Sequence, residues 1–171
     1  MIKDNAFMQK ILKIAWCKIY IAENWLAPVA LLATRLYVGR FFWQSGQTKI
    51  STPGSARALF ESEYIPNWQA HHIKRLWGMD IPFPVPGAAF GVTTSTFSEL
   101  VFSALLMTGL MGRVAALGIF MMTLAIEMFV YPGTDEHYYW MLTMAIIMAY
   151  GPGKISVDHF IRKKLLDNAA G

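Results

Sequence analysis

Two long apolar runs constrain the fold of this chain more than any other feature. Thr94–Met111 and Val114–Tyr131 each contain 18 residues, and each carries a single acidic side chain, Glu99 or Glu127. At 1.5 Å per residue, a helix over either run is about 27 Å long, close to the roughly 30 Å thickness of a bilayer's hydrocarbon core. Only Gly112 and Arg113 separate the runs. This short connection predicts an antiparallel helical hairpin that crosses a membrane.

The overall composition agrees with this interpretation. The chain of 171 residues is 55% hydrophobic and only 15% charged, whereas soluble domains have roughly 25% charged residues. Two further apolar stretches are long enough to be spans once their ends are extended. We expect an all-α membrane protein, a four-transmembrane-helix bundle forming one domain over residues 1–171, with spans at roughly 25–45, 94–111, 114–131 and 137–155.

The amino-terminal segment predicts an additional amphipathic helix. Phe7, Ile11, Ala15 and Ile19 recur every four residues, and lysines occupy another face. These lysines interrupt any signal-peptide core, so we expect the segment to be retained. Such a helix either lies on the membrane surface or packs on the end of the bundle.

A long polar stretch over residues 46–93 separates the first two spans and is expected to form an outer loop. It contains a short amphipathic helix, SARALFESEY, followed by the proline strip IPFPVPG, which favours an extended conformation. His71 and His72 are adjacent, so in a helix they would point about 100° apart and would need other ligands to hold a metal. Solvated loop histidines are the simpler interpretation.

The distribution of basic residues predicts the topology. Lysines and arginines concentrate in the amino-terminal segment, at Arg113 and in the tail, which lie on one side of the membrane if there are four spans. The positive-inside rule then places both termini in the cytoplasm, and the acidic YPGTDEH turn faces outward. Nucleic acid is not an expected partner, because the basic residues flank apolar segments instead of forming one patch.

Several polar side chains lie inside or at the ends of the predicted spans, at similar depth. Counting residues from the span ends puts Arg40, Glu99, Glu127 and His137 within roughly 8 Å of one level near the outer surface. Ionisable residues on several membrane helices commonly mark a substrate or proton path. The candidate pocket residues are Arg35, Arg40, Gln44, Glu99, Glu127 and His137. A quinone, which is planar with polar carbonyls, or a small anion attracted by the arginines would suit such a pocket.

The same charges have a purely structural interpretation. A lone arginine in hydrocarbon costs several kcal/mol, so Arg35 and Arg40 can be neutralised by Glu99 and Glu127 in a network that locks the bundle. Arg35, the deepest of them, fits either interpretation.

No metal site is expected. The single cysteine, Cys17, excludes disulfides within the chain and thiolate-rich metal sites. Met141, Met144 and Met148 recur along one face of the fourth span and resemble a soft copper(I) path, but flexible core packing explains them better.

Four sequence motifs, in order, resemble those of the DoxX family. The first span has the form RLxxGxxFxxxGxxK, with Arg35, Gly39, Gly46 and Lys49, and the second span has an early glutamate, Glu99. The turn GLMGRVAAL and the segment GPGKISVD follow, and the family pattern also marks Gly109, Gly151, Gly153, Ser156 and Asp158. The chain departs from the usual pattern in the length of its outer loop.

The resemblance implies a small, multi-pass protein of the bacterial inner membrane, usually linked to redox functions. One relative is similar to the membrane subunit of a thiosulfate:quinone oxidoreductase, and others are associated with oxidative-stress complexes or copper-related peptide systems. The pattern supplies no catalytic residue. We expect a redox-associated membrane protein that binds a quinone or a small oxidisable anion. The alternative is a non-catalytic anchor or assembly subunit for a redox or metal-handling partner, with a homo-oligomer also open.

Overall fold

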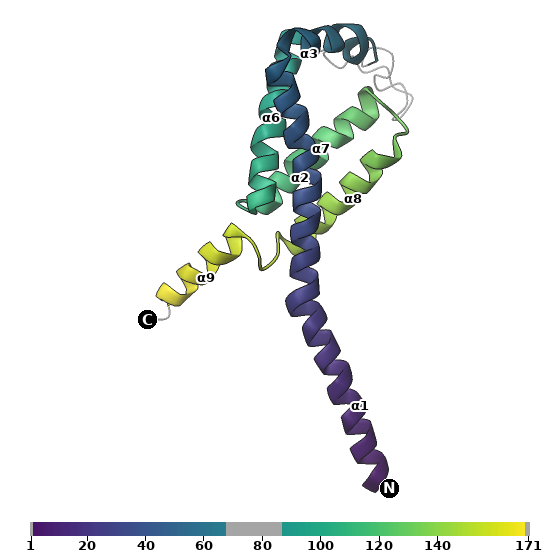
Figure 1. Cartoon of the computed structure of the whole chain (residues 1–171), viewed down its shortest axis with the longest axis vertical. Coiled ribbons are helices and arrows are strands. Elements are labelled where there is room, and N and C mark those ends of the chain that lie inside the picture. Colours follow the sequence, from purple (N-terminus) through teal and green to yellow (C-terminus); the bar gives the residue numbers. More distant parts are fainter. Residues whose placement is uncertain (1, 68–86, 170–171) are drawn as a thin grey trace, which may run out of the picture.

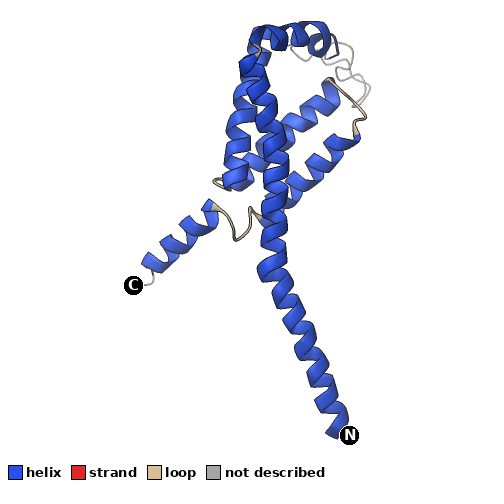
Figure 2. Cartoon of the chain, viewed as in Figure 1, coloured by secondary structure: helices blue, strands red, loops and turns tan. Residues whose placement is uncertain are grey.

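A computed structural model describes residues 2–67 and 87–169, and every regular element in these ranges is a helix (Figure 2). No strand occurs within the described ranges, which confirms the all-α prediction. His71, His72 and most of the proline strip lie outside the described residues.

The longest feature is a nearly continuous helical rod (Figure 1). It consists of α1 (Ile2–Ile21), the π-helical turn η1 (Ala22–Leu26) and α2 (Ala27–Ser51). The sequence predicts that the first helix lies on the membrane or packs on the bundle end. α1 extends the rod away from the bundle, so it does not pack on the bundle end. The segment Ala22–Leu26 contains no glycine or proline to break the helix. The wide turn η1 lies just before Pro28, which lacks the N–H of a regular helical bond.

Two further helical pieces follow α2 and turn across the end of the bundle. α3 (Pro53–Leu59) and the π-helical turn η2 (Phe60–Tyr64) cover the segment for which the sequence predicts a short amphipathic helix. We call this end of the bundle the α3 end (Figure 1). Phe60, the first residue of η2, is buried, so this segment packs inward on the bundle.

The two apolar runs form the predicted antiparallel hairpin, α6 (Ala88–Thr108) and α7 (Gly112–Phe129). Its turn lies at Gly109–Met111, a few residues earlier than the sequence predicts. Gly109 has a φ of +70° and its N–H donates to the Leu105 carbonyl at 2.9 Å, which ends α6. Gly112 instead begins α7.

The last two helices are α8 (Asp135–Tyr150) and α9 (Val157–Ala169). The sequence predicts a span continuing to residue 155, but α8 ends at Tyr150. Gly151 and Gly153 have φ values of +85° and +87°, which turn the chain out of the helical direction. α9 then projects sideways from the bundle, at what we call the α9 end (Figure 1).

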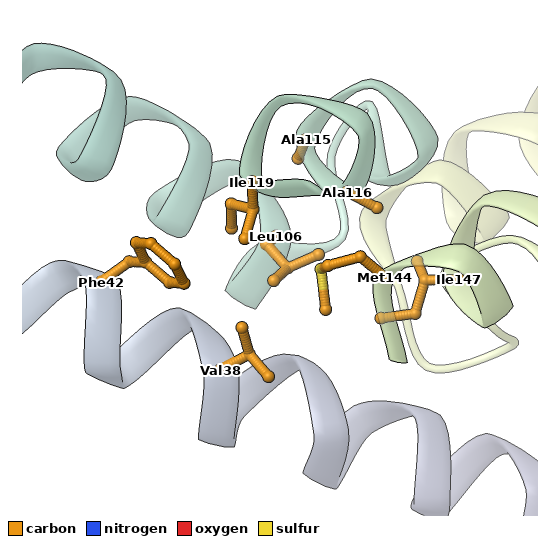
Figure 3. Close-up of a cluster of buried hydrophobic side chains, with 8 residues drawn as sticks. All are labelled: Val38, Phe42, Leu106, Ala115, Ala116, Ile119, Met144 and Ile147. Carbon is orange, nitrogen blue, oxygen red and sulfur yellow. The ribbon is translucent and has the colours of Figure 1, made fainter. Parts of the chain in front are cut away.

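Helices α2, α6, α7 and α8 share one apolar core (Figure 3). α6 packs along α2 and α7, and α7 packs along α8. The core side chains are Val38 and Phe42 from α2, Leu106 from α6, Ala115, Ala116 and Ile119 from α7, and Met144 and Ile147 from α8. The two alanines keep α7 close to its neighbours, as small residues do in membrane helix packing. Met144 is fully buried here, as core packing of the methionines predicts.

Two helices within the described ranges are long and apolar enough to cross a bilayer, α6 with 21 residues and α7 with 18. Only 22% of the apolar window of α6 is buried inside the bundle. The core helix of a soluble protein would be mostly buried. Most residues of α6 are only partly covered by the bundle, and Phe90 and Phe97 are exposed, which suits a lipid environment.

Glycine at position 46 allows α2 to approach α6 closely. A Cβ atom at Gly46 would lie 2.8 Å from Cγ of Leu100, whereas one at Gly54 would meet nothing within 4 Å. We predict that Gly46→Leu lowers the free energy of unfolding by about 1–3 kcal/mol through overpacking, and that Gly54→Leu does not. Thermal unfolding of the purified protein in detergent measures both. Equal melting temperatures for the two variants would contradict close packing at Gly46.

Candidate functional site

A cavity of about 610 Å³ opens at the α3 end of the bundle. Side chains from α2, η2, α6, α7 and α8 line it, so five elements far apart in sequence build one space. Its aromatic lining residues are Phe41, Phe42, Phe60, Tyr64, Phe90, Tyr131 and Trp140. The walls are therefore mainly apolar and aromatic, with polar groups at a few defined positions.

An ion pair between Lys49 and Glu99 forms the first polar position. Lys49 Nζ lies 2.5 Å from Glu99 Oε1, and these side chains are only 12% and 6% exposed. Lys49 also donates to the Ser45 hydroxyl at 3.3 Å. The second carboxylate oxygen, Glu99 Oε2, is buried and has no hydrogen-bond partner among the described residues. A buried acceptor without a donor is costly, so a ligand hydroxyl or N–H at this position would be stabilised.

His137 forms the second polar position, and Glu127 holds it from behind. His137 lines the cavity, and its Nδ1 lies 2.8 Å from Glu127 Oε2. Glu127 Oε1 accepts hydrogen bonds from the Gly133 N–H at 2.5 Å and the Tyr138 hydroxyl at 2.7 Å. Both Glu127 oxygens are thus occupied in closing the α7–α8 turn. Because Nδ1 of His137 is bound to Glu127, Nε2 is the ring nitrogen left for a ligand.

Tyrosines from η2 and the α7–α8 turn cover the cavity. The Tyr131 hydroxyl donates to Glu63 Oε2 at 2.5 Å, and the rings of Tyr64 and Tyr131 pack edge to face at 5.7 Å. Burial, followed by the negative charges of Glu99 and Glu63, raises the pKa of Tyr64. The Tyr64 hydroxyl, which is protonated near neutral pH like that of any ordinary tyrosine, can donate a hydrogen bond.

The six candidate residues from the sequence separate into three groups. Glu99 and His137 line the cavity, and Glu127 contacts His137. Arg40 and Gln44 are exposed on α2 and are not part of the cavity lining. Arg35 is fully buried, but it lies near the α9 end.

Arg35 is bound to the loop that precedes α9. Its Nη2 donates to the Ile155 carbonyl, while Nε and Nη1 have no hydrogen-bond partner among the described residues. The guanidinium packs directly on Gly109, where a Cβ atom would overlap Nη1. Gly109 thus serves two purposes, a left-handed turn and space for a buried cation.

Asp158 fastens the start of α9 to the α6–α7 turn. Its Oδ1 accepts from the Met111 N–H and its Oδ2 from the Gly112 N–H, both at 2.8 Å. The Asp158 N–H in turn donates to the Gly109 carbonyl at 3.1 Å. Met111 has a φ of +49°, which is unusual for a residue with a side chain. Asp158 therefore stabilises an otherwise unfavourable turn and supplies a negative charge near Arg35.

The pairing of charges differs from the structural network that the sequence suggests. Glu99 pairs with Lys49 instead of an arginine, and Glu127 pairs with His137. Rotation about the helix axis explains the difference. Lys49 lies fourteen residues from Arg35 and so returns to nearly the same face, whereas Arg40 lies about 140° away.

Several cavity residues were not among the candidates from the sequence. Lys49 appeared there only as a family position, and Phe60, Tyr64 and Trp140 had no assigned role. The helical periodicity places Lys49 on the same face of α2 as Arg35 and Phe42, and this spacing in the sequence could have identified it as an inward-facing residue. The tyrosine and phenylalanine of η2 have no comparable signal, because their position depends on how the chain folds back after α2.

No metal centre is visible in the described part of the chain. No group of three or more histidine, cysteine or acidic side chains gathers there in a way that could hold an ion. Met122 lines the cavity, whereas Met121 is exposed and Met144 lies in the core. These methionines do not share one site in the structure.

We predict that Lys49→Met lowers the free energy of unfolding by about 3–5 kcal/mol, because it leaves a buried carboxylate without its cation. Adding Glu99→Gln should recover most of this loss, since the second change removes the stranded charge. Denaturant unfolding in detergent of the single and double variants measures the coupling. A double variant less stable than Lys49→Met alone would show that the two side chains act independently.

We predict that Asp158→Ala lowers the free energy of unfolding by about 1–3 kcal/mol, because the turn N–H groups lose their acceptors. Asp167→Ala removes the same charge from an exposed position of α9 and should have little effect. Thermal unfolding of both variants provides the comparison. Equal stability would argue against Asp158 as the fastening residue.

Comparisons with known proteins identify the family. The family model described as DoxX matches residues 30–132, more than half of the chain. Comparisons with curated proteins and with solved structures gave no match. The matched segment includes α6, α7 and most of α2, together with Lys49, Glu99 and Glu127. The chain is a helical membrane protein and belongs to the DoxX family.

Proposed function

We propose that this protein binds a quinone-type ring in the cavity at the α3 end and acts in a redox process of the bacterial inner membrane. The observation that carries the proposal is the combination of aromatic walls with the buried Lys49–Glu99 pair and His137. A volume of about 610 Å³ lies within the usual range of roughly 300–1,000 Å³ for small-molecule sites.

The membrane arrangement in this proposal has four spans, formed by α2, α6, α7 and α8. All four contribute to one core, and α6 and α7 have the length and hydropathy of membrane helices. α1, the α6–α7 turn and α9 lie toward the same end of the bundle (Figure 1). Together with Arg113 and Lys154, which lie at the same end, they carry nine of the 15 lysines and arginines, so the positive-inside rule places this end and both termini in the cytoplasm. The cavity then opens toward the outer face.

The chemistry of the lining suits a quinone head group. Trp140 and Phe90 line the cavity and offer aromatic surfaces for a planar ring. Lys49 is available as a donor for a carbonyl oxygen. Nε2 of His137 can accept from a ring hydroxyl, because the ring proton lies on Nδ1 against the Glu127 carboxylate, and the unpaired Glu99 Oε2 can accept as well. The protein thus has complementary groups for both the carbonyl and the hydroxyl form of such a ring.

A small oxidisable anion fits the cavity less well. Lys49 is already neutralised by Glu99, and the unpaired carboxylate oxygen would repel a negative ligand. Arg40, which could attract an anion, is exposed and outside the lining. The electrostatics therefore favour an uncharged ring.

A second candidate function, an anchor or assembly subunit, rests on α1. This helix continues from η1 and extends beyond the bundle, and its side chains from Met8 to Tyr20 are exposed. Ile11, Ile14 and Trp16 are among the large apolar side chains left uncovered. A protein partner in a redox or metal-handling complex would cover them, and this role does not require a ligand in the cavity.

We predict saturable binding of ubiquinone-1 to the purified protein, weakened about tenfold by Trp140→Leu through loss of one aromatic wall. Isothermal titration calorimetry in detergent measures the affinity. Trp43→Leu is the matched control, since Trp43 neighbours Phe42 but does not line the cavity, and its effect should stay within roughly twofold. Absence of binding to a cooperatively folding protein would reject the quinone proposal and favour the anchor role. Equal losses in both variants would place the ring outside this cavity.

A further inference from the structure

A second cavity, of about 400 Å³, lies at the α9 end, opposite the first. The α6–α7 turn, the loop of residues 151–156 and the first turns of α9 surround it. Its basic lining residues are Arg113, Lys154, His159 and Arg162. They come from three separate segments and face one common space. None of them takes part in the quinone proposal.

The charge around this cavity is strongly positive. Asp158 is its one acidic lining residue within the described ranges, and both of its oxygens already accept N–H groups of the α6–α7 turn. The buried Arg35 adds a further cation close to the wall. A Cβ atom at Gly109 would meet both Arg35 and Ser156, and Ser156 lines the cavity. The cavity therefore has an excess of cationic groups over its one carboxylate.

The cations retain hydrogen-bonding capacity. Arg113 donates through Nη2 to the Ala149 carbonyl at 3.3 Å, which orients its guanidinium against Gly151 and leaves its other N–H groups. Lys154 donates to the Asn24 side chain. The side chains of Arg162 and His159 have no hydrogen bond or ion pair with any other described residue. Two guanidinium groups around one space suit the tetrahedral oxygens of a phosphate.

Two apolar stripes begin at this cavity and run along the bundle. Val114 and Tyr150 line the cavity and are about half and four-fifths exposed. On α7, Val114 is followed by exposed Leu117 and Met121. On α8, Tyr150 is preceded by exposed side chains at positions 146 and 142. The spacings keep each stripe on one helix face, and α7 and α8 pack side by side.

We propose that this cavity binds the phosphodiester head group of an anionic phospholipid, with its acyl chains along the two stripes. The basic side chains would bind a phosphate group, either in a lipid head group or as free phosphate. The apolar stripes favour the lipid, because free phosphate has nothing to place there. Basic pockets at the cytoplasmic ends of membrane helices are suited to such head groups. The site would hold the loop and α9 against the inner leaflet, independently of what binds at the α3 end.

The test is a lipid titration of the full-length protein in nonionic detergent, with bound lipid counted by native mass spectrometry. The probes are dioleoylphosphatidylglycerol, dioleoylphosphatidylcholine and inorganic phosphate. We expect phosphatidylglycerol to bind about tenfold more tightly than phosphatidylcholine, and Arg162→Gln to abolish most of that preference.

Lys163→Gln is the matched control, because it removes the same charge from the neighbouring position of α9, outside the cavity lining. It should change the affinity by less than roughly twofold. Equal losses in Arg162→Gln and Lys163→Gln would show diffuse surface attraction and overturn the proposal. Full displacement of phosphatidylglycerol by millimolar inorganic phosphate would assign the cavity to free phosphate and also overturn it. Arg113→Gln, on another helix, should reproduce the Arg162→Gln result and guards against local unfolding of α9.

Discussion

The ion pair between Lys49 and Glu99 is the interaction on which the α3 end of the structure depends. It joins α2 to α6 at a depth where either charge alone would be costly, so it favours the one rotation of α2 that brings both groups together. Gly46, one turn below Lys49, lets the two helices approach closely enough for the contact. The same rotation directs Phe42 into the core and leaves Arg40 exposed. Both side chains of the pair line the cavity.

The inward face of α2 organises the whole bundle. Arg35 and Lys49 lie fourteen residues apart on this face, or about 21 Å along the helix. Apolar side chains, Val38 and Phe42, fill the distance between them and contact α6, α7 and α8. Each cation receives a partner from a different part of the chain, Glu99 for Lys49 and the loop before α9 for Arg35. The two ends therefore have separate polar clusters with separate chemistry, divided by an apolar core.

Much of the fold could be predicted from the sequence, because membrane helices follow simple rules of length and hydropathy. The helical hairpin α6–α7 and the position of Glu99 follow from the apolar runs and one early glutamate. Depth along the helices brought Glu99 and His137 to the same level, and the structure places both in the cavity lining. Depth alone could not predict that Lys49 faces the cavity and that Arg40 does not. Their roles depend on rotation, which depends in turn on where Gly39 and Gly46 allow α6 to pack.

Other features lay beyond sequence reasoning for physical reasons. The fold of η2 over the cavity depends on contacts of Tyr64 and Glu63 with Tyr131, between segments far apart in the chain. The continuation of α1 into α2 depends on a π-helical turn that accommodates Pro28, whereas a proline usually suggests a break. The early end of α8 depends on two glycines with positive φ, and apolar content alone would have extended the helix.

The most direct measurement of the central claim is an experimental structure of the protein prepared with ubiquinone-1. The account predicts density for a planar ring inside the cavity and against Trp140, with a ring oxygen within hydrogen-bond distance of Lys49 or His137. It also predicts that the Lys49–Glu99 contact is retained. A ring bound elsewhere on the protein, or a cavity filled by the side chains of η2, would contradict it.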